Sequence, residues 1–408
     1  MHKALHFFIV DDDKAQLSVL QKLLEDAGHQ VTAFTSSAEA LQQLPALQPD
    51  CILSDLLTAQ VDGLQLLLDT RKLAIKQPKF IIISGKAFEF DRRRSFELGV
   101  DGYMTKPLDS QHFLKDVMEI VHDLMIIEFW GVRGTLPVPG KETVKYGGNT
   151  NCVTLRFAKR HFFIFDAGTG IKALSNHLAK QKHTPIDAKI FISHPHYDHI
   201  NGLPFFAPLY TKGNHFEIIG SDHGDLTIEQ LIANQMDSVY FPVTTKEFSA
   251  KLTFRSISEG SFDIDDLHIQ AIYLNHPGRC LGYRITHHDK VFCYMTDNEL
   301  YLEDSPHYKA ADEKRFIDFA KNADLLVVDT TYTSKGYLKK VGWGHSSVER
   351  VVNLADKANV KLLCLYHHDP DQLDNDIDTK LKEAEKLLND RHSNTRCIAP
   401  HEGDQLII

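Results

Sequence analysis

The segment that decides the fold of this sequence is His194-Pro195-His196-Tyr197-Asp198-His199. It follows an apolar run, Lys189–Ser193, that predicts a short strand. Two histidines one residue apart at a strand end can bind one ion from the same side, and the aspartate and histidine that follow turn toward a second ion. Four potential ligands within six residues are difficult to explain by structural needs alone. The segment therefore predicts a metal centre.

A centre with two ions needs further ligands, and three later residues each follow an apolar, strand-like run: His276, Asp297 and His367. An aspartate that lies between two cations can bridge them with its two oxygens. Closely spaced divalent ions also lower the pKa of a shared water, which then attacks the substrate as hydroxide near neutral pH. His368 neighbours His367 and is the alternative ligand if the register differs by one residue.

With its complete HxHxDH pattern, the region from residue 124 to 408 resembles the metallo-β-lactamase fold superfamily. The resemblance implies an αβ/βα sandwich that acts as a metal-dependent hydrolase. It assigns His194, His196 and His276 to one metal, Asp198, His199 and His367 to the other, and Asp297 to the bridging position. Mixed nitrogen and oxygen ligation suits Zn²⁺, Mn²⁺ or Fe.

Two further motifs favour phosphodiester cleavage. Val328-Asp329-Thr330-Thr331 ends a predicted strand, and Gly342-Trp343-Gly344-His345-Ser346-Ser347 opens a predicted helix. They resemble the acidic strand end and the GHST-type motif of tRNase Z and related phosphodiesterases. The resemblance implies that Asp329 orients His345, which donates a proton or hydrogen bond to the phosphate or leaving oxygen. Asp198, Asp329 and His345 are thus the expected catalytic residues, although His345 could instead cap the helix.

The N-terminal region alternates predicted strands with amphipathic helices, which implies a doubly wound, five-stranded parallel sheet. The predicted strands are Leu5–Val10, Val31–Phe34, Cys51–Leu53, Phe80–Ser84 and Gly102–Met104. Functional groups gather at the carboxyl ends of such strands. Asp11, Asp12 and Asp55 stand there and would form an oxygen site for Mg²⁺, and Lys106 would neutralise a phosphoryl group.

This arrangement resembles the receiver domain of two-component response regulators, over residues 1–123, with the hydrolase domain occupying 124–408. The resemblance implies that a sensor histidine kinase phosphorylates Asp55, with Mg²⁺ held by Asp11, Asp12 and Asp55. Ser84 takes the hydroxyl position and Lys106 the lysine position, while Tyr103 is the switching aromatic residue. The joint between the domains is very short, so we expect coupled motion. A homodimer formed through the receiver is plausible.

The composition and the short motifs argue against several classes of protein. The net charge of −10 argues against a general affinity for nucleic acid, and no helix-turn-helix pattern follows the receiver to suggest binding to DNA. The longest apolar runs are strand-length, which argues against a membrane span. None of the six cysteines forms a CxxC pair, so we expect buried, reduced thiols in a cytoplasmic protein.

The composite hypothesis is a response regulator whose output is a phosphodiesterase. The acidic charge, and the lack of an added arm like that of tRNase Z, favour a small substrate such as a cyclic nucleotide or another small phosphodiester. The alternatives are an ester, thioester or lactone hydrolase of the same fold, or a non-catalytic, metal-binding sensor. Arg133 could reach a phosphate or be structural, and Asp166 is expected to support the metal loop. The aromatic residues within 205–265 could stack on a base, or they could pack the core or a dimer interface: Phe205, Phe206, Tyr210, Tyr240 and Phe241.

Overall fold

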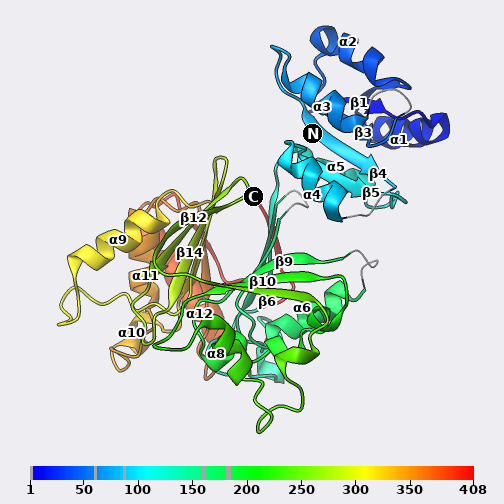
Figure 1. The fold of residues 1–408 in the computed structure, drawn as a ribbon. Coiled ribbons are helices and arrows are strands. Elements are labelled where there is room, and N and C mark those ends of the chain that lie inside the picture. Colours follow the sequence, from blue (N-terminus) through cyan, green and yellow to red (C-terminus); the bar gives the residue numbers. More distant parts are fainter. Residues whose placement is uncertain (1–2, 59–61, 86–88, 158–160, 181–184) are drawn as a thin grey trace. The chain divides into compact units, whose positions relative to one another are not determined.

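The computed structural model describes residues 3–58, 62–85, 89–157, 161–180 and 185–408. The chain divides into two compact units, the first drawn in blue to cyan and the second mainly in green to red (Figure 1). The first unit comprises Met1–Met125 and Arg156–His161, and the second comprises Ile126–Leu155 and Phe162–Ile408.

The first unit contains a five-stranded parallel sheet with the strand order β2-β1-β3-β4-β5. Its strands are β1 His6–Val10, β2 Gln30–Phe34, β3 Cys51–Asp55, β4 Lys79–Ser84 and β5 Gly102–Thr105, and its helices are α1 Lys14–Asp26, α2 Ser37–Leu47, α3 Gly63–Arg71, α4 Glu89–Glu97 and α5 Phe113–Val121. Successive side chains of a strand point to opposite faces. Accordingly, Phe7 and Ile9 join one hydrophobic cluster with α1 and α5, whereas Phe8 and Val10 join another with α2 and α3. The predicted doubly wound sheet is confirmed.

The second unit contains two seven-stranded sheets, which confirms the predicted sandwich class. The first has the order β11-β10-β9-β8-β7-β6-β19 and the second β12-β13-β14-β15-β16-β17-β18. The strands are β6 Met125–Gly131, β7 Cys152–Phe157, β8 His161–Phe165, β9 Asp187–Phe191, β10 His215–Gly220, β11 Lys251–Ser256, β12 Gly260–Ile264, β13 Leu267–Tyr273, β14 Leu281–His287, β15 Lys290–Met295, β16 Leu325–Asp329, β17 Leu362–Tyr366, β18 Arg396–Ile398 and β19 Gln405–Ile407. The α-helices are α6 Gly170–Leu178, α7 Tyr197–Ile200, α8 Ile228–Asn234, α9 Ala310–Ala320, α10 Ser334–Tyr337, α11 Val348–Lys357 and α12 Asp374–Asp390.

One edge of the second sheet gathers the polar strand ends. Strands β13, β15, β16 and β17 run in the same direction, because β14 is antiparallel to both β13 and β15 while β15, β16 and β17 are parallel. Their carboxyl ends therefore meet at one edge, where they present His276, Asp297, Asp329 and His367. Asp297 and His367 have left-handed backbone conformations, with φ of 46° and 58°. Such strained conformations concentrate at functional sites.

The cysteine side chains and the lengths of the helices bear on two expectations from the sequence. All six cysteines are free thiols, five of them buried and Cys397 partly exposed. Within the described ranges, we find no helix with the length and apolar character needed to cross a bilayer.

Candidate metal centre

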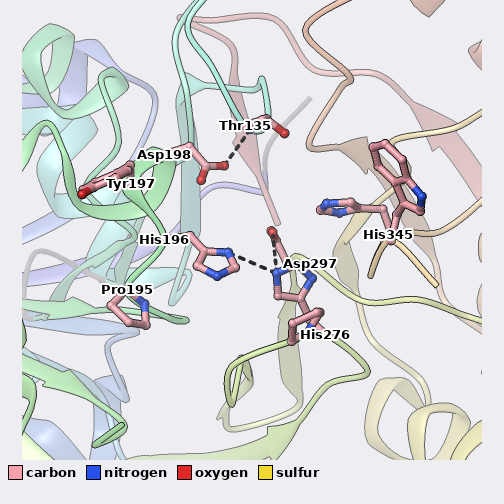
Figure 2. Close-up of a pocket in the computed structure, with 10 residues that line it drawn as sticks. Thr135, Pro195, His196, Tyr197, Asp198, His276, Asp297 and His345 are labelled. Atoms are coloured by element: carbon pink, nitrogen blue, oxygen red, sulfur yellow. Dashed lines mark hydrogen bonds and ion pairs between the residues drawn. The ribbon is translucent and has the colours of Figure 1, made fainter. Parts of the chain in front are cut away.

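The first group of donor atoms consists of three histidines and one oxygen of Asp297. The Nε2 atoms of His194 and His276 each lie 3.7 Å from Asp297 Oδ2. His196 Nδ1 lies 3.2 Å from His276 Nε2, on the side of the pocket that Figure 2 shows beside Asp297. All four donor atoms fit within 4.8 Å of one another. This is the set that the sequence predicted for the first metal.

The second group uses the other oxygen of Asp297. Its Oδ1 lies 3.2 Å from His199 Nε2 and 3.1 Å from His367 Nε2. Asp198 Oδ2 completes the group, 3.2 Å from each of the same two nitrogens. These four donor atoms also fit within 4.8 Å of one another. Asp297 therefore faces both groups at once, one oxygen to each, which is the arrangement of a bridging carboxylate.

The donor residues differ in protonation. For His199, burial lowers the pKa, but the carboxylates of Asp198, Asp297 and Asp166 outweigh this and raise it well above its usual value. Burial lowers the pKa of His194 well below its usual value, so the ring is neutral and offers a lone pair. Its Nε2 is buried and has no hydrogen-bond partner among the described residues. For Asp297, burial raises the pKa, but the rings of His367 and His199 outweigh this and hold it well below its usual value. A buried, partnerless nitrogen beside an ionised carboxylate fits a bound metal ion.

The outward nitrogens of the buried rings are also held in place. Each of four Nδ1 atoms has a partner: Ser193 Oγ for His194 at 3.1 Å, Asp166 Oδ2 for His199 at 2.7 Å, Gly344 O for His276 at 2.9 Å, and Thr331 Oγ1 for His367 at 3.1 Å. Donation of the Nδ1 proton outward leaves the Nε2 lone pair directed into the centre. Asp166 also accepts hydrogen bonds from the backbone and hydroxyl of Ser193 and from Tyr294, so its role is structural, as expected.

The alternative ligand, His368, belongs to neither donor group. Its ring is fully buried, and burial lowers its pKa well below the usual value. Neither ring nitrogen has a hydrogen-bond partner in the described part of the chain. The geometry thus selects His367, whose ring packs so closely on Gly134 that a side chain there would collide with it.

His345 and Asp329 form a pair beside both groups. His345 Nδ1 donates to Asp329 Oδ2 at 2.7 Å, and the His345 ring stacks on that of His367 with the centroids 4.9 Å apart. Burial lowers the pKa of His345, but the Asp329 carboxylate outweighs it and raises the pKa to about 9. Asp329 is fully buried and also accepts from the backbone and hydroxyl of Thr331. His345 therefore holds a proton near the centre, and it does not cap α11, whose N-cap is Ser347.

A pocket of about 430 Å³ opens onto these residues. It is lined by Thr135, Pro195, His196, Tyr197, Asp198, His276, Pro277, Asp297, Trp343 and His345. In Figure 2, Tyr197 and His345 lie on opposite sides of the pocket, with Asp297 between them, and the Thr135 amide donates to Asp198 Oδ2 at 2.8 Å. Among the described residues, the aromatics that we expected within 205–265 do not line this pocket. Trp343 and Tyr197 take that position instead.

In the first unit, Lys106 joins two of the expected acidic residues. Its Nζ lies 3.1 Å from Asp11 Oδ2 and forms an ion pair with Asp55. Ser84 is buried, Tyr103 is half-buried, and burial raises the pKa of Tyr103. Asp12 is exposed, and over the residues described, Asp11, Asp12 and Asp55 do not gather as tightly as the two donor groups of the second unit.

Comparison with protein families assigns both units. A family model described as a response regulator receiver domain matches residues 7–118, and one described as a β-lactamase superfamily domain matches residues 161–368, just over half of the chain. The chain belongs to the β-lactamase superfamily. Its N-terminal unit is a receiver domain, which implies a histidine kinase as the phosphoryl donor. Together with the donor groups, the superfamily fold supports a metal-dependent hydrolase and implies divalent metals.

Individual relatives of this β-lactamase superfamily protein match one unit at a time. Ribonuclease Z of Prochlorococcus marinus is 26% identical over 287 residues, which cover 59% of this chain and 90% of the relative. The alkaline phosphatase synthesis transcriptional regulatory protein PhoP of Bacillus subtilis is 33% identical over 99 residues, covering 24% of this chain and 41% of PhoP. The metallo-β-lactamase fold protein YhfI of Bacillus subtilis has a TM-score of 0.51 and 18% identity, covers 70% of this chain and is itself covered completely, which shows the shared fold.

Arg133 is structural in this superfamily member. Its side chain is fully buried, its Nε donates to Gly147 O at 2.9 Å, and its Nη1 donates to Gln372 O. It does not line the pocket formed by the described residues. The interpretation in which Arg133 reaches a phosphate is therefore wrong.

Glu299 is a buried residue that sequence reasoning missed. Its carboxylate accepts hydrogen bonds from the Tyr337 hydroxyl at 2.8 Å and from the amides of Gly342 and Gly344 at 2.7 Å each. The carbonyl of Gly344 in turn accepts from His276 Nδ1. Glu299 thus fixes the loop that carries Trp343 and His345 and, through one peptide, orients a donor of the first group. Its position only two residues after Asp297 was the available signal.

Proposed function

We propose that this chain is a response regulator whose output domain is a dinuclear-metal phosphodiesterase, acting on a cyclic nucleotide or another small phosphodiester. The observation that carries the proposal is the Asp329–His345 pair, because its histidine lines the pocket and packs against both His276 of the first group and His367 of the second. Cleavage of a phosphodiester releases an alkoxide oxygen that must gain a proton, and an acid–histidine pair can supply that proton. An activated ester or a thioester, by contrast, releases a leaving group that departs as a stable anion.

The ligand assignment is part of the proposal. His194, His196 and His276 would hold one ion, Asp198, His199 and His367 the other, and Asp297 both. Zn²⁺, Mn²⁺ and Fe all suit this mixture of nitrogen and oxygen donors. When bound, the two ions would supply Lewis acidity and lower the pKa of water at the site.

Three side chains of the protein would accept, donate or orient protons during hydrolysis. Asp198 lines the pocket as well as the second group, and we place it where it can accept a proton from the attacking water. His345 gives its proton to the oxygen that leaves when the phosphorus–oxygen bond breaks. Asp329 keeps the ring oriented, since it holds His345 Nδ1 at 2.7 Å while its own oxygens are fixed by Thr331. The relative named ribonuclease Z supports chemistry on a phosphodiester.

The enzymatic half is tested by hydrolysis of a panel of phosphodiesters. Purified protein loaded with Mn²⁺ or Zn²⁺ is assayed on 2′,3′- and 3′,5′-cyclic nucleotides, linear dinucleotides and glycerophosphodiesters. We expect turnover of at least one member that is lost when a chelator removes the metal. Metal-loaded protein that cleaves none of them would exclude the phosphodiesterase.

The regulatory half assigns phosphorylation to Asp55, with Mg²⁺ at Asp11, Asp12 and Asp55. The supporting geometry is the ion pair of Lys106 with both Asp55 and Asp11, because a phosphoryl group on Asp55 must rearrange it. Ser84 and Tyr103, on the neighbouring strands, would respond to the new phosphoryl oxygens. Beryllofluoride, which mimics the phosphoryl group, should change the hydrolysis rate of the wild type and leave Asp55→Asn unchanged. Equal rates under all four conditions would contradict phosphorylation control.

A further inference from the structure

We infer that Trp343 and Tyr197 form a binding subsite for the aromatic base of a nucleoside phosphodiester. This inference rests on the proposed function and narrows its substrate to molecules in which a base lies close to the scissile phosphate. Neither residue was singled out by sequence motifs for this role.

The first observation is the solvent exposure of two large aromatic side chains. Trp343 is 58% exposed and Tyr197 is 78% exposed, and both line the pocket above the donor groups. Tyr197 begins α7 directly after His196, and Trp343 stands two residues before His345. Figure 2 places Tyr197 and His345 on opposite sides of the pocket. Exposed aromatic rings that line a pocket offer stacking surfaces on either side of the reacting centre.

The second observation is that hydrogen bonds hold the backbone on both sides of Trp343. The amides on both sides of it, from Gly342 and Gly344, donate to the buried carboxylate of Glu299. Both glycines have φ of 86°, a left-handed conformation that a side chain would strain. A side chain at Gly344 would also collide with the His276 ring. The backbone that carries the ring is therefore fixed, so a ligand that stacks on Trp343 does not also have to order the loop, which limits the entropic cost of binding.

The third observation concerns charge. The ammonium of Lys340 lies 3.8 Å from the centroid of the Trp343 ring, and Lys335 and Lys339 are exposed on the same segment. A cation on the indole face places positive charge beside a surface suited to a flat ring. Positive charge attracts phosphate, and the ring attracts a base. A nucleotide carries both groups, whereas a glycerophosphodiester carries only the phosphate, so the combination favours a nucleotide.

Direct binding can be measured because the chain has two tryptophans, Trp130 and Trp343. Trp130 lies on β6, is half-buried and donates to Thr154 Oγ1, away from the pocket. In a Trp130→Phe variant the fluorescence reports Trp343 alone. We expect the nucleoside 5′-monophosphates AMP, GMP, CMP or UMP to quench it, and ribose 5-phosphate to leave it unchanged. Quenching by none of the four, or equal quenching by ribose 5-phosphate, would overturn the inference.

Kinetics distinguish a failed subsite from a failed phosphodiesterase. Trp343→Ala should lower kcat/KM for a cyclic nucleotide about 10- to 100-fold, the range of one lost stacking contact, and leave glycerophosphoethanolamine hydrolysis and metal content unchanged. Tyr197→Ala should act in the same direction, and Trp343→Phe should keep most activity. The matched control is Tyr240→Ala, which removes a ring that is 82% exposed and outside the pocket.

The outcomes separate as follows. If Trp343→Ala lowers kcat/KM equally for both substrates, the proposed subsite is wrong, but the proposed phosphodiesterase activity is retained. If the wild type cleaves neither substrate, the phosphodiesterase is wrong, and the fluorescence titration still decides whether a base binds at Trp343. Loss of nucleotide hydrolysis in the Tyr240→Ala control would also overturn the inference, because it would show that the effect is not specific to the pocket.

Discussion

Asp297 is the residue on which both donor groups depend. Its two oxygens face different groups, its backbone is held at a left-handed φ of 46°, and the Thr296 hydroxyl donates to Oδ1 at 2.8 Å. His196, by contrast, contributes to the first group alone and is exposed. A side chain shared between two cations lowers the repulsion between them, so its loss affects both.

The number of bound metal ions should therefore differ between variants of these two residues. We expect Asp297→Ala to lose both ions and His196→Ala to lose at most one, as measured by elemental analysis after gel filtration in metal-free buffer. Two ions per chain in folded Asp297→Ala would contradict the shared role. Circular dichroism of both variants controls for unfolding, since Asp297 is buried and its removal leaves a cavity.

His345→Ala separates phosphodiester chemistry from ester chemistry. We expect kcat on a phosphodiester to fall about 10²- to 10⁴-fold, the usual contribution of a general acid. Hydrolysis of an activated ester such as p-nitrophenyl acetate should change little, because its leaving group departs as a stable anion without a proton. Asp329→Asn should give a smaller loss of the same kind, with metal content retained in both variants. An equal loss on esters and phosphodiesters would favour the alternative ester hydrolase.

At the scale of elements, helix α12 carries a lysine that is buried under the end of β16. Lys380 is fully buried, and its ammonium donates to the carbonyls of Thr330 and Thr331. Burial lowers its pKa to about 7, with the Arg133 charge acting in the same direction and the carboxylates of Asp329, Asp369 and Asp376 opposing it. The helix thus anchors the strand end that supports the Asp329–His345 pair.

The lowered pKa of Lys380 makes a pH-dependent contribution to the free energy of unfolding. Between pH 7 and 10.5 the unfolded lysine binds more protons than the folded one, so raising the pH over this window increases the free energy of unfolding. Lys380→Met should remove that contribution, so wild type should gain stability relative to the variant between pH 7 and pH 9.5 in urea titrations. Lys382→Met, on the exposed face of α12, is the control and should run parallel to wild type. A constant difference between wild type and Lys380→Met would contradict the shifted pKa.

The sequence predicted the interior strands better than the edges. In the second unit, apolar runs in the sequence predict nine strands, at 126–130, 152–157, 161–166, 189–193, 267–274, 282–286, 291–296, 325–329 and 361–366. The four edge strands β11, β12, β18 and β19 are not among them, and neither is the interior strand β10. Edge strands bury little: β11 is Lys-Leu-Thr-Phe-Arg-Ser with no fully buried residue, and β19 has three residues. They lack the apolar run by which β16 and β17 were predicted, because only one side of each is paired.

The donor residues were visible in sequence, whereas the residues that support them were not. The HxHxDH spacing fixes four donors locally, and His276, Asp297 and His367 each follow an apolar strand. Glu299 and Trp343 have no such pattern, because their roles come from contacts with residues more than forty positions away or from exposure at a pocket. Such contacts depend on the folded chain.

At the scale of the whole molecule, the chain combines two units with separate cores and separate candidate sites. A ligand that binds only the folded state raises the stability of the unit that holds it. The receiver has an acidic site near Asp55, and the hydrolase domain has the donor groups around Asp297.

Thermal unfolding should therefore show two transitions that respond to different ligands. Zn²⁺ or Mn²⁺ should raise the Tm of one, by an amount that Asp297→Ala abolishes, and Mg²⁺ with beryllofluoride should raise the Tm of the other, by an amount that Asp55→Asn abolishes. Differential scanning calorimetry measures both. One transition that shifts equally with either ligand would instead indicate that the two units unfold as a single cooperative body.

The pairing of β19 with β6 has a consequence for biosynthesis. Strand β6 opens the hydrolase domain, but its partner, Gln405–Ile407, leaves the ribosome only after the rest of that domain. The receiver folds from residues that emerge before those of the hydrolase domain, whereas the donor His367 and strand β19 emerge long after β6. A nascent chain can therefore complete the receiver, with Asp55, well before it can complete the donor groups around Asp297, so the two units fold one after the other during synthesis.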